Sequence, residues 1–127
     1  MAIASWLSRH AQVERVYYPG LDSHPGRQVH ERQAYGPGAV LSFELPTVEM
    51  ARAFMRSVTL PLLAVSLGGV ESILSYPATM SHASVPPGER MARGITDKLV
   101  RLSVGLEDPA DLIVDFEQAL AKSDTLS

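Results

Sequence analysis

Arg101 is the residue whose type and setting most clearly suggest ligand binding. It lies within an alternating segment, Leu99 to Val104, whose even-numbered residues form an apolar face while Arg101 and Ser103 share the opposite one. A guanidinium held on a strand presents planar donors that match a carboxylate through two parallel hydrogen bonds. Periodicity alone favours a simpler interpretation, an arginine on the solvated face of a half-buried sheet.

Three further polar side chains stand next to predicted turns. Ser66 precedes Leu67-Gly68-Gly69, and a hydroxyl at a strand end either donates to a ligand or satisfies the turn. Tyr76 and His82 flank a long, proline-rich stretch from Pro77 to Gly94, a loop length that is often functional. Taken alone, the residues favour a satisfied turn for Ser66 and exposed loop positions for Tyr76 and His82.

The motifs of several other chemistries are missing from the sequence. The histidines include no i, i+4 pair with a glutamate between them, and no third ligand stands near His24 and His30, so we expect no metal site. There is no G-x-S-x-G, no P-loop and no G-x-G-x-x-G. The absence of cysteine excludes disulfides and thiolate chemistry, and it fits a cytoplasmic protein.

Composition limits the class of protein further. A chain of 127 residues with 46% hydrophobic residues can bury the core of one domain, so we expect residues 1–127 to form a single unit. The net charge of −3 and the scattered arginines argue against a nucleic-acid partner. No apolar run reaches membrane-spanning length and no signal peptide is evident, so we expect no membrane contact.

The elements that must position these side chains alternate between helix and strand. Apolar spacing predicts helices over residues 3–10, 47–58 and 108–122, with Thr47 and Asp108 as caps, and Pro25 to Gln33 suits a short helix. Strands are predicted over residues 13–18, 39–45, 62–66, 70–76 and 99–104. We therefore predict an α/β (α+β two-layer) domain, a small, mostly antiparallel sheet with helices packed on it.

The first predicted helix has no capping residue before it. The pattern runs from Met1 onward, whereas a helix start more often shows Ser, Thr, Asp or Asn. Either this is an ordinary frayed start, or the chain begins inside a longer helix.

Several segments, in order, resemble the Cys/Met-metabolism (trans-sulfuration) family of pyridoxal-phosphate (PLP) enzymes. They are YPGL (18–21), SHP (23–25), SLGGVES (66–72), YPATMSH (76–82), GITD (94–97) and LVRLSVGLED (99–108). Each is weak alone, but the ordered set covers nearly the whole chain. Val65 is similar to the valine that many bacterial lyases and sulfhydrylases of the family carry, and the run Ile73 to Ala78 most resembles bacterial cystathionine β/γ-lyases.

The resemblance implies a fold and an activity. Members of the family have the aspartate-aminotransferase-like (fold type I) architecture, a large PLP domain followed by a small C-terminal domain. This chain is similar to the small domain, with the large one absent, from an enzyme that acts on C–S bonds of sulfur amino acids. Residues 1–12 are then the tail of the helix that joins the two domains. O-acetylhomoserine sulfhydrylase, methionine γ-lyase and cystathionine γ-synthase are the alternatives within the family.

The resemblance also assigns roles to residues. It makes Arg101 the ligand of the substrate α-carboxylate and places Ser66 against the substrate, with Val65, Leu67, Tyr76 and His82 as candidates to line the pocket. It implies a homo-oligomer, a tetramer as in relatives, in which the large domain holds PLP.

The lysines of this chain depart from the family pattern. PLP chemistry needs a Schiff-base lysine, and neither Lys98 nor Lys122 matches that motif. We therefore expect no catalytic, cofactor-binding or metal-binding residue here and no activity from the chain alone. A hypothesis of another class is a stand-alone, non-catalytic binding or assembly module.

Overall fold

Five strands form one sheet in the computed structural model, which describes residues 1–125. The strands are β1 (Arg15–Tyr17), β2 (Val40–Glu44), β3 (Leu62–Leu63), β4 (Ile73–Ser75) and β5 (Leu99–Ser103), in the order β1-β2-β5-β4-β3. Every pair is antiparallel except β3 with β4, which is parallel. The predicted α/β fold with a mostly antiparallel sheet is therefore confirmed.

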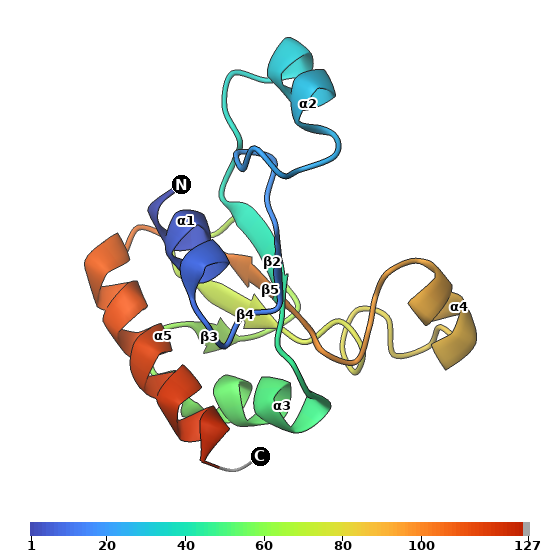
Figure 1. Ribbon diagram of the computed structural model, residues 1–127, viewed down its shortest axis with the longest axis vertical. Coiled ribbons are helices and arrows are strands. Elements are labelled where there is room, and N and C mark those ends of the chain that lie inside the picture. The colour runs from blue at the N-terminus through green and yellow to red at the C-terminus, as the bar shows by residue number, and fades with distance from the viewer. Residues whose placement is uncertain (126–127) are drawn as a thin grey trace.

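Three helices cover one face of this sheet: α1 (Ala2–Arg9), α3 (Val48–Ser57) and α5 (Pro109–Asp124). Figure 1 shows α5 running along one side of the sheet with α3 beside it. The predicted caps are present, since the Thr47 side chain accepts from Met50 N at 3.1 Å and Asp108 from Ala110 N at 2.8 Å. The start of α1 has no side-chain cap, as its sequence predicted.

The core lies between this face and the three helices. Leu41 and Phe43 of β2 point into it with Val100 and Leu102 of β5, all at most 4% exposed. The rings of Phe43, Phe54 and Phe116 then meet edge to face, with centroid separations of 5.5 and 5.6 Å. This burial of apolar and aromatic surface fixes which side of each strand faces inward.

Two predictions about the connecting segments were wrong. The stretch from Pro77 to Gly94 is not all loop, because Pro87–Ala92 forms α4, which begins after Pro86 and carries a buried Arg90 paired with Asp97. The predicted buried strand 62–66 is reduced to β3, whose two leucines are 50% and 51% exposed. It lies at the sheet edge, where no helix covers it.

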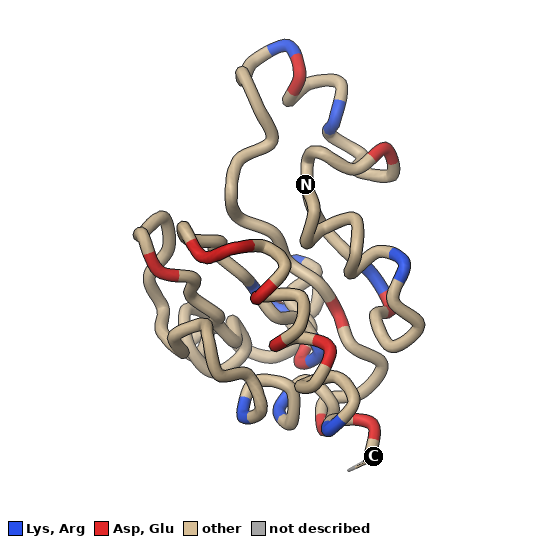
Figure 2. Tube along the Cα trace, turned by 90° about the vertical axis from the view of Figure 1, so that its left-hand side faces the viewer, with Lys and Arg blue, Asp and Glu red and all other residues tan. Residues whose placement is uncertain are grey.

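The short helix predicted near Pro25 is also present, as α2 (Arg27–Gln33). None of its residues is buried, and it stands clear of the sheet in Figure 1. Among residues 1–125, no helix is long and apolar enough to cross a membrane. Figure 2 shows acidic and basic positions interspersed along the described trace.

The second face of the sheet carries a row of polar side chains that positions the candidate site. Strand register places Tyr17, Ser42, Arg101 and Ser75 in one row across β1, β2, β5 and β4. Residues directly opposite each other on antiparallel strands share a face of the sheet. The alternation that buries the even-numbered residues of β5 therefore directs Arg101 to the side away from the three helices.

Candidate functional site

The Arg101 guanidinium is held by the protein itself. Its Nη2 donates to the backbone oxygen of Val65 at 2.6 Å and to Ser75 Oγ at 3.1 Å. The Ser75 hydroxyl in turn donates to the backbone oxygen of Ala64. Arg101 is half-buried and Ser75 is fully buried, so the arginine is fixed between β4 and the start of the loop that joins β3 to β4.

That loop, residues 64–72, is here called the SLGG loop. Besides Arg101, two more odd-numbered residues hold this loop, Ser103 at the end of β5 and Gly105 just after it. Gly68 N donates to Ser103 Oγ at 2.8 Å, and Gly105 N donates to Ser72 Oγ at 2.9 Å. Two segments that carry the family resemblance thus lie side by side, joined along their length.

Glu107 completes this attachment. Its Oε1 accepts from Ser72 N at 2.8 Å and its Oε2 from the Ser72 hydroxyl at 2.7 Å. Burial opposes ionisation of Glu107, but these hydrogen bonds outweigh it, so the pKa of this carboxyl lies below its ordinary value. Glu107 is therefore a carboxylate at neutral pH, and it clamps the C-terminal end of the SLGG loop.

Two glycines make the close approach feasible. A Cβ on Gly105 would lie 2.5 Å from the carbonyl carbon of Glu71 and 2.6 Å from Ser72 N, both backbone atoms that cannot move aside. Gly68 adopts a φ of +75°, in the left-handed region that favours glycine. The close packing of the SLGG loop against residues 103–108 thus explains the glycine at position 105, and the backbone conformation of the loop explains the glycine at position 68.

The candidate residues on the SLGG loop lie beside Arg101. The Val65 carbonyl contacts the guanidinium, while the side chains of Val65 and Leu67 are 55% and 53% exposed. Ser66 lies between them and is exposed. The structure thus brings Arg101, Val65, Ser66 and Leu67 into one region, with apolar side chains next to a cationic group.

The structure does not bring Tyr76 and His82 to Arg101. Tyr76 is buried in the core, not exposed, and its hydroxyl donates to the backbone oxygen of Asp97. Burial raises the pKa of the Tyr76 phenol. His82 is half-buried, with its Nδ1 2.8 Å from Ser81 Oγ. The contacts of both residues stabilise the segment that includes α4.

Neither lysine stands where it could serve a cofactor at this site. Lys98 Nζ forms an ion pair with Glu14 Oε2 at 2.6 Å, beside β1, and Lys122 is exposed in the last turns of α5. These residues do not fit PLP, which requires a lysine able to form an imine beside the substrate. Within residues 1–125, no group of three His, Asp or Glu side chains could hold a metal ion.

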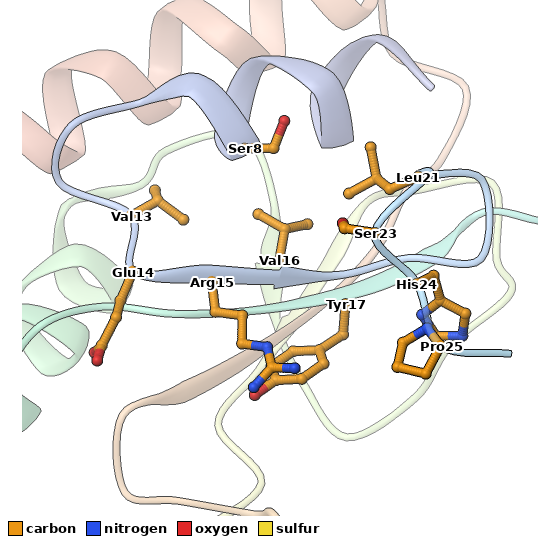
Figure 3. Close-up of a pocket in the computed structure, with 10 residues that line it drawn as sticks. All are labelled: Ser8, Val13, Glu14, Arg15, Val16, Tyr17, Leu21, Ser23, His24 and Pro25. Carbon is orange, nitrogen blue, oxygen red and sulfur yellow. The ribbon is translucent and has the colours of Figure 1, made fainter. Parts of the chain in front are cut away.

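A hollow of about 250 Å³ lies elsewhere, at the β1 edge of the sheet (Figure 3). Its lining includes Glu14, Arg15, Tyr17 and His24 but no residue of the SLGG loop and no Arg101. The Arg15 guanidinium lies 4.9 Å from the centre of the Tyr17 ring. Burial and the neighbouring Glu44 carboxylate raise the pKa of Tyr17. This hollow is separate from the candidate site.

Sequence reasoning missed the side chains that hold the site in place, Ser72, Ser75, Ser103 and Glu107. A signal existed for Ser103, which shares the Arg101 face of the same strand. Ser75 is opposite Arg101 only once the pairing of β4 with β5 is known, and the Ser72–Glu107 contact joins residues 35 apart. Neither contact follows from local periodicity.

Comparisons with known proteins support the resemblance. The chain is 59% identical over 118 residues to cystathionine beta-lyase MetC of Bacillus subtilis (strain 168), covering 93% of this chain and 30% of that protein. It is 48% identical over 122 residues to cystathionine gamma-lyase of Dictyostelium discoideum, covering 95% and 32% respectively. The chain thus spans about a third of the length of these relatives.

A solved structure also supports the resemblance to this family. The fold matches cystathionine gamma synthase from Xanthomonas oryzae pv. oryzae in complex with cystathionine, with a TM-score of 0.94 and 44% identity, over 99% of this chain and 33% of that one. The sequence model of the Cys/Met metabolism PLP-dependent enzymes matches residues 1–121. The chain therefore belongs to the Cys/Met metabolism PLP-dependent enzyme family.

Proposed function

We propose that residues 1–127 form the C-terminal, substrate-binding domain of a larger PLP-dependent enzyme that acts on C–S bonds of sulfur amino acids, in the manner of a cystathionine β- or γ-lyase. The observation that carries the proposal is Arg101, fixed on the polar face of the sheet next to the SLGG loop. The relatives named above, with 59% and 48% identity, are cystathionine lyases.

In this proposal Arg101 docks the substrate α-carboxylate. Nη2 is already shared between Val65 O and Ser75 Oγ, so the guanidinium donors without a partner among residues 1–125 are those on Nε and Nη1. A charge-assisted hydrogen bond from such a donor to a carboxylate is stronger than one between neutral groups. Ser66 assists from the adjoining loop, and the exposed Val65 and Leu67 suit the apolar chain of a thioether substrate.

The cofactor belongs to another part of the enzyme in this proposal. Lys98 is paired with Glu14 and Lys122 lies on the surface of α5, so neither is offered as the PLP lysine. We propose that PLP and the reacting groups reside in the two thirds of the relatives' length that this chain does not match. The isolated chain is then inactive, and its role is to bind and orient the substrate.

A domain graft tests the proposal. The 118 residues of this chain that align with Bacillus subtilis MetC replace their counterparts in that enzyme, and cleavage of cystathionine is measured with PLP present. We expect an active hybrid, in which Arg101→Ala lowers kcat/KM about 30- to 150-fold. Arg56→Ala, which changes an exposed arginine on α3, is the matched control and should leave kcat/KM within about twofold.

Two outcomes would contradict the proposal. One is a folded, PLP-loaded hybrid without C–S cleavage, which would favour a non-catalytic binding module. The other is an Arg101→Ala loss below about threefold, which would remove Arg101 from substrate binding. Assays with methionine, and with O-acetylhomoserine plus sulfide, separate the alternative activities within the family.

A further inference from the structure

Ser75 occupies a particular position with respect to the candidate site. It is fully buried at the end of β4, and strand register places it directly opposite Arg101 of β5. Its Oγ lies 3.1 Å from Arg101 Nη2, and its hydroxyl donates to the backbone oxygen of Ala64. We infer that Ser75 is a positioning residue, whose hydroxyl fixes the rotation of the Arg101 guanidinium before any substrate binds.

The chemistry of a hydroxyl suits this role. A serine hydroxyl accepts through its lone pairs and donates one proton, so Ser75 can accept from Arg101 and donate to Ala64 at the same time. Alanine can do neither. Ser75 thereby joins the guanidinium and the beginning of the SLGG loop through one buried oxygen.

Two hydrogen-bond acceptors fix the orientation of the guanidinium plane more closely than one acceptor would. With Val65 O and Ser75 Oγ both on Nη2, the group cannot turn freely about its long side chain, whose rotamer freedom is otherwise costly to restrict. Nε and Nη1 have no hydrogen-bond partner among residues 1–125 and stay available to a ligand. Loss of the Ser75 hydroxyl leaves Val65 O as the single hydrogen-bond partner among residues 1–125 and lets the plane rotate.

The consequence for catalysis rests on the proposed function, in which Arg101 binds a carboxylate. Binding of a ligand costs less conformational entropy when the donors of the arginine are already oriented. Ser75 would thus raise substrate affinity without touching the substrate. Its effect should depend entirely on Arg101, and this dependence separates positioning from a general structural role.

The chain supplies a matched control in Ser72. This serine is equally buried, and its hydroxyl also makes two hydrogen bonds, to Glu107 Oε2 and from Gly105 N. It lies at the other end of the SLGG loop, and none of its hydrogen bonds among residues 1–125 is to Arg101. Ser72→Ala therefore removes a buried hydroxyl from the same loop without removing a partner of the guanidinium.

The first test requires no activity. In the 127-residue chain labelled with ¹⁵N, NMR reports the Arg101 Nε–H signal and the rate of rotation about the Cζ–Nε and Cζ–Nη bonds. We expect slow rotation in the wild type and in Ser72→Ala, and rotation about tenfold faster in Ser75→Ala, the loss of about one hydrogen bond. Equal rates in wild type and Ser75→Ala would overturn the inference.

The second test is a double-mutant cycle in the MetC graft. Ser75→Ala should lower kcat/KM about 5- to 10-fold, chiefly through KM, and should have less than about twofold effect once Arg101 is alanine. Ser75→Thr, which retains the hydroxyl, is the second variant and should stay closer to wild type. An equal Ser75→Ala loss in both backgrounds would show a structural role and overturn the inference.

The two tests also separate failure of the inference from failure of the proposed function. If Arg101→Ala leaves the graft unaffected while Ser75→Ala speeds guanidinium rotation, the proposed carboxylate role is wrong but Ser75 still positions Arg101. If Arg101→Ala abolishes activity while Ser75→Ala changes neither rotation nor kcat/KM, the proposed function stands and the role of Ser75 is wrong.

Discussion

Both carboxylate oxygens of Glu107 accept hydrogen bonds from a single residue, Ser72, one from its backbone N–H at 2.8 Å and one from its hydroxyl at 2.7 Å. This pair joins the end of the SLGG loop to the segment that follows β5. Because Ser72 is fully buried, its donors have little access to water. Removing their acceptor therefore leaves them unsatisfied, which costs more than the hydrogen bonds alone contribute.

Glu107→Gln should destabilise the chain by about 1–2 kcal/mol, because an amide offers one acceptor atom where the carboxylate offers two. Urea unfolding followed by Trp6 fluorescence measures this. Glu71→Gln is the control, since Glu71 is an exposed neighbour with no side-chain partner among residues 1–125. Equal losses from the two substitutions would show that Glu107 is not a clamp.

Gly105→Ala should be far more disruptive than an ordinary surface substitution. The added Cβ would meet backbone atoms of Glu71 and Ser72, so the SLGG loop must shift, at a cost of about 2–4 kcal/mol. Thermal unfolding by circular dichroism measures the loss. Gly88→Ala in α4, where no heavy atom lies within 4 Å of the new Cβ, should be neutral or slightly stabilising.

The hydrogen bonds of Asp115 lead to a prediction of how the free energy of unfolding depends on pH. This buried residue of α5 accepts hydrogen bonds from the backbone of Thr59 and Leu60, from the Thr59 hydroxyl and from Gln118, at 2.8 to 3.0 Å. Burial opposes its ionisation, but these donors outweigh burial and hold the pKa of Asp115 below its ordinary value of 3.8.

A carboxyl whose pKa is lower in the folded state binds its proton more readily when unfolded. Its contribution to stability is therefore complete above pH 3.8 and is lost as the pH falls through the lower folded value. We expect Asp115→Asn to cost about 1–3 kcal/mol at pH 7, and the difference from wild type to shrink as the pH falls below 3.8. Urea unfolding at several pH values measures it.

The exposed Asp111, on the same helix, is the control for this pH dependence. Asp111→Asn should change stability by less than about 0.5 kcal/mol at pH 7, a small helix-dipole effect. A gap between wild type and Asp115→Asn that stays constant from pH 7 to pH 3 would contradict a lowered pKa at Asp115.

Arg101→Lys should recover little of the activity that Arg101→Ala removes from the MetC graft. An ammonium group is a compact charge without the planar donors that contact Val65 O and Ser75 Oγ and, in the proposed function, also bind a carboxylate. We expect less than about tenfold recovery in kcat/KM. Full recovery by lysine would mean that charge alone suffices at this position.

Ser66→Ala should have a smaller effect than any change at Arg101. Ser66 is exposed, and in the proposed function it contributes at most one neutral hydrogen bond to the substrate, so we expect kcat/KM of the graft to fall about 2- to 10-fold. Steady-state kinetics with cystathionine measures this. An unchanged kcat/KM would remove Ser66 from the substrate site and leave Arg101 as its principal residue.

The sequence by itself determined the elements and the direction of their side chains. Alternation in residues 39–45 and 99–104 and the apolar spacing of 3–10, 47–58 and 108–122 predicted two central strands and three core helices, and the structure confirms them. These patterns are local, because a strand repeats every two residues and a helix every 3.6. The ordered family segments added the prediction that Arg101 and Ser66 bind the substrate.

Only the tertiary structure decided what holds Arg101 in place. Ser75 is 26 residues from Arg101, and Glu107 is 35 residues from Ser72. Such contacts depend on which strands pair and in which register, and core packing across the whole chain sets this. The same packing left β3 exposed at the sheet edge and paired the buried Arg90 of α4 with Asp97, features that no local repeat encodes.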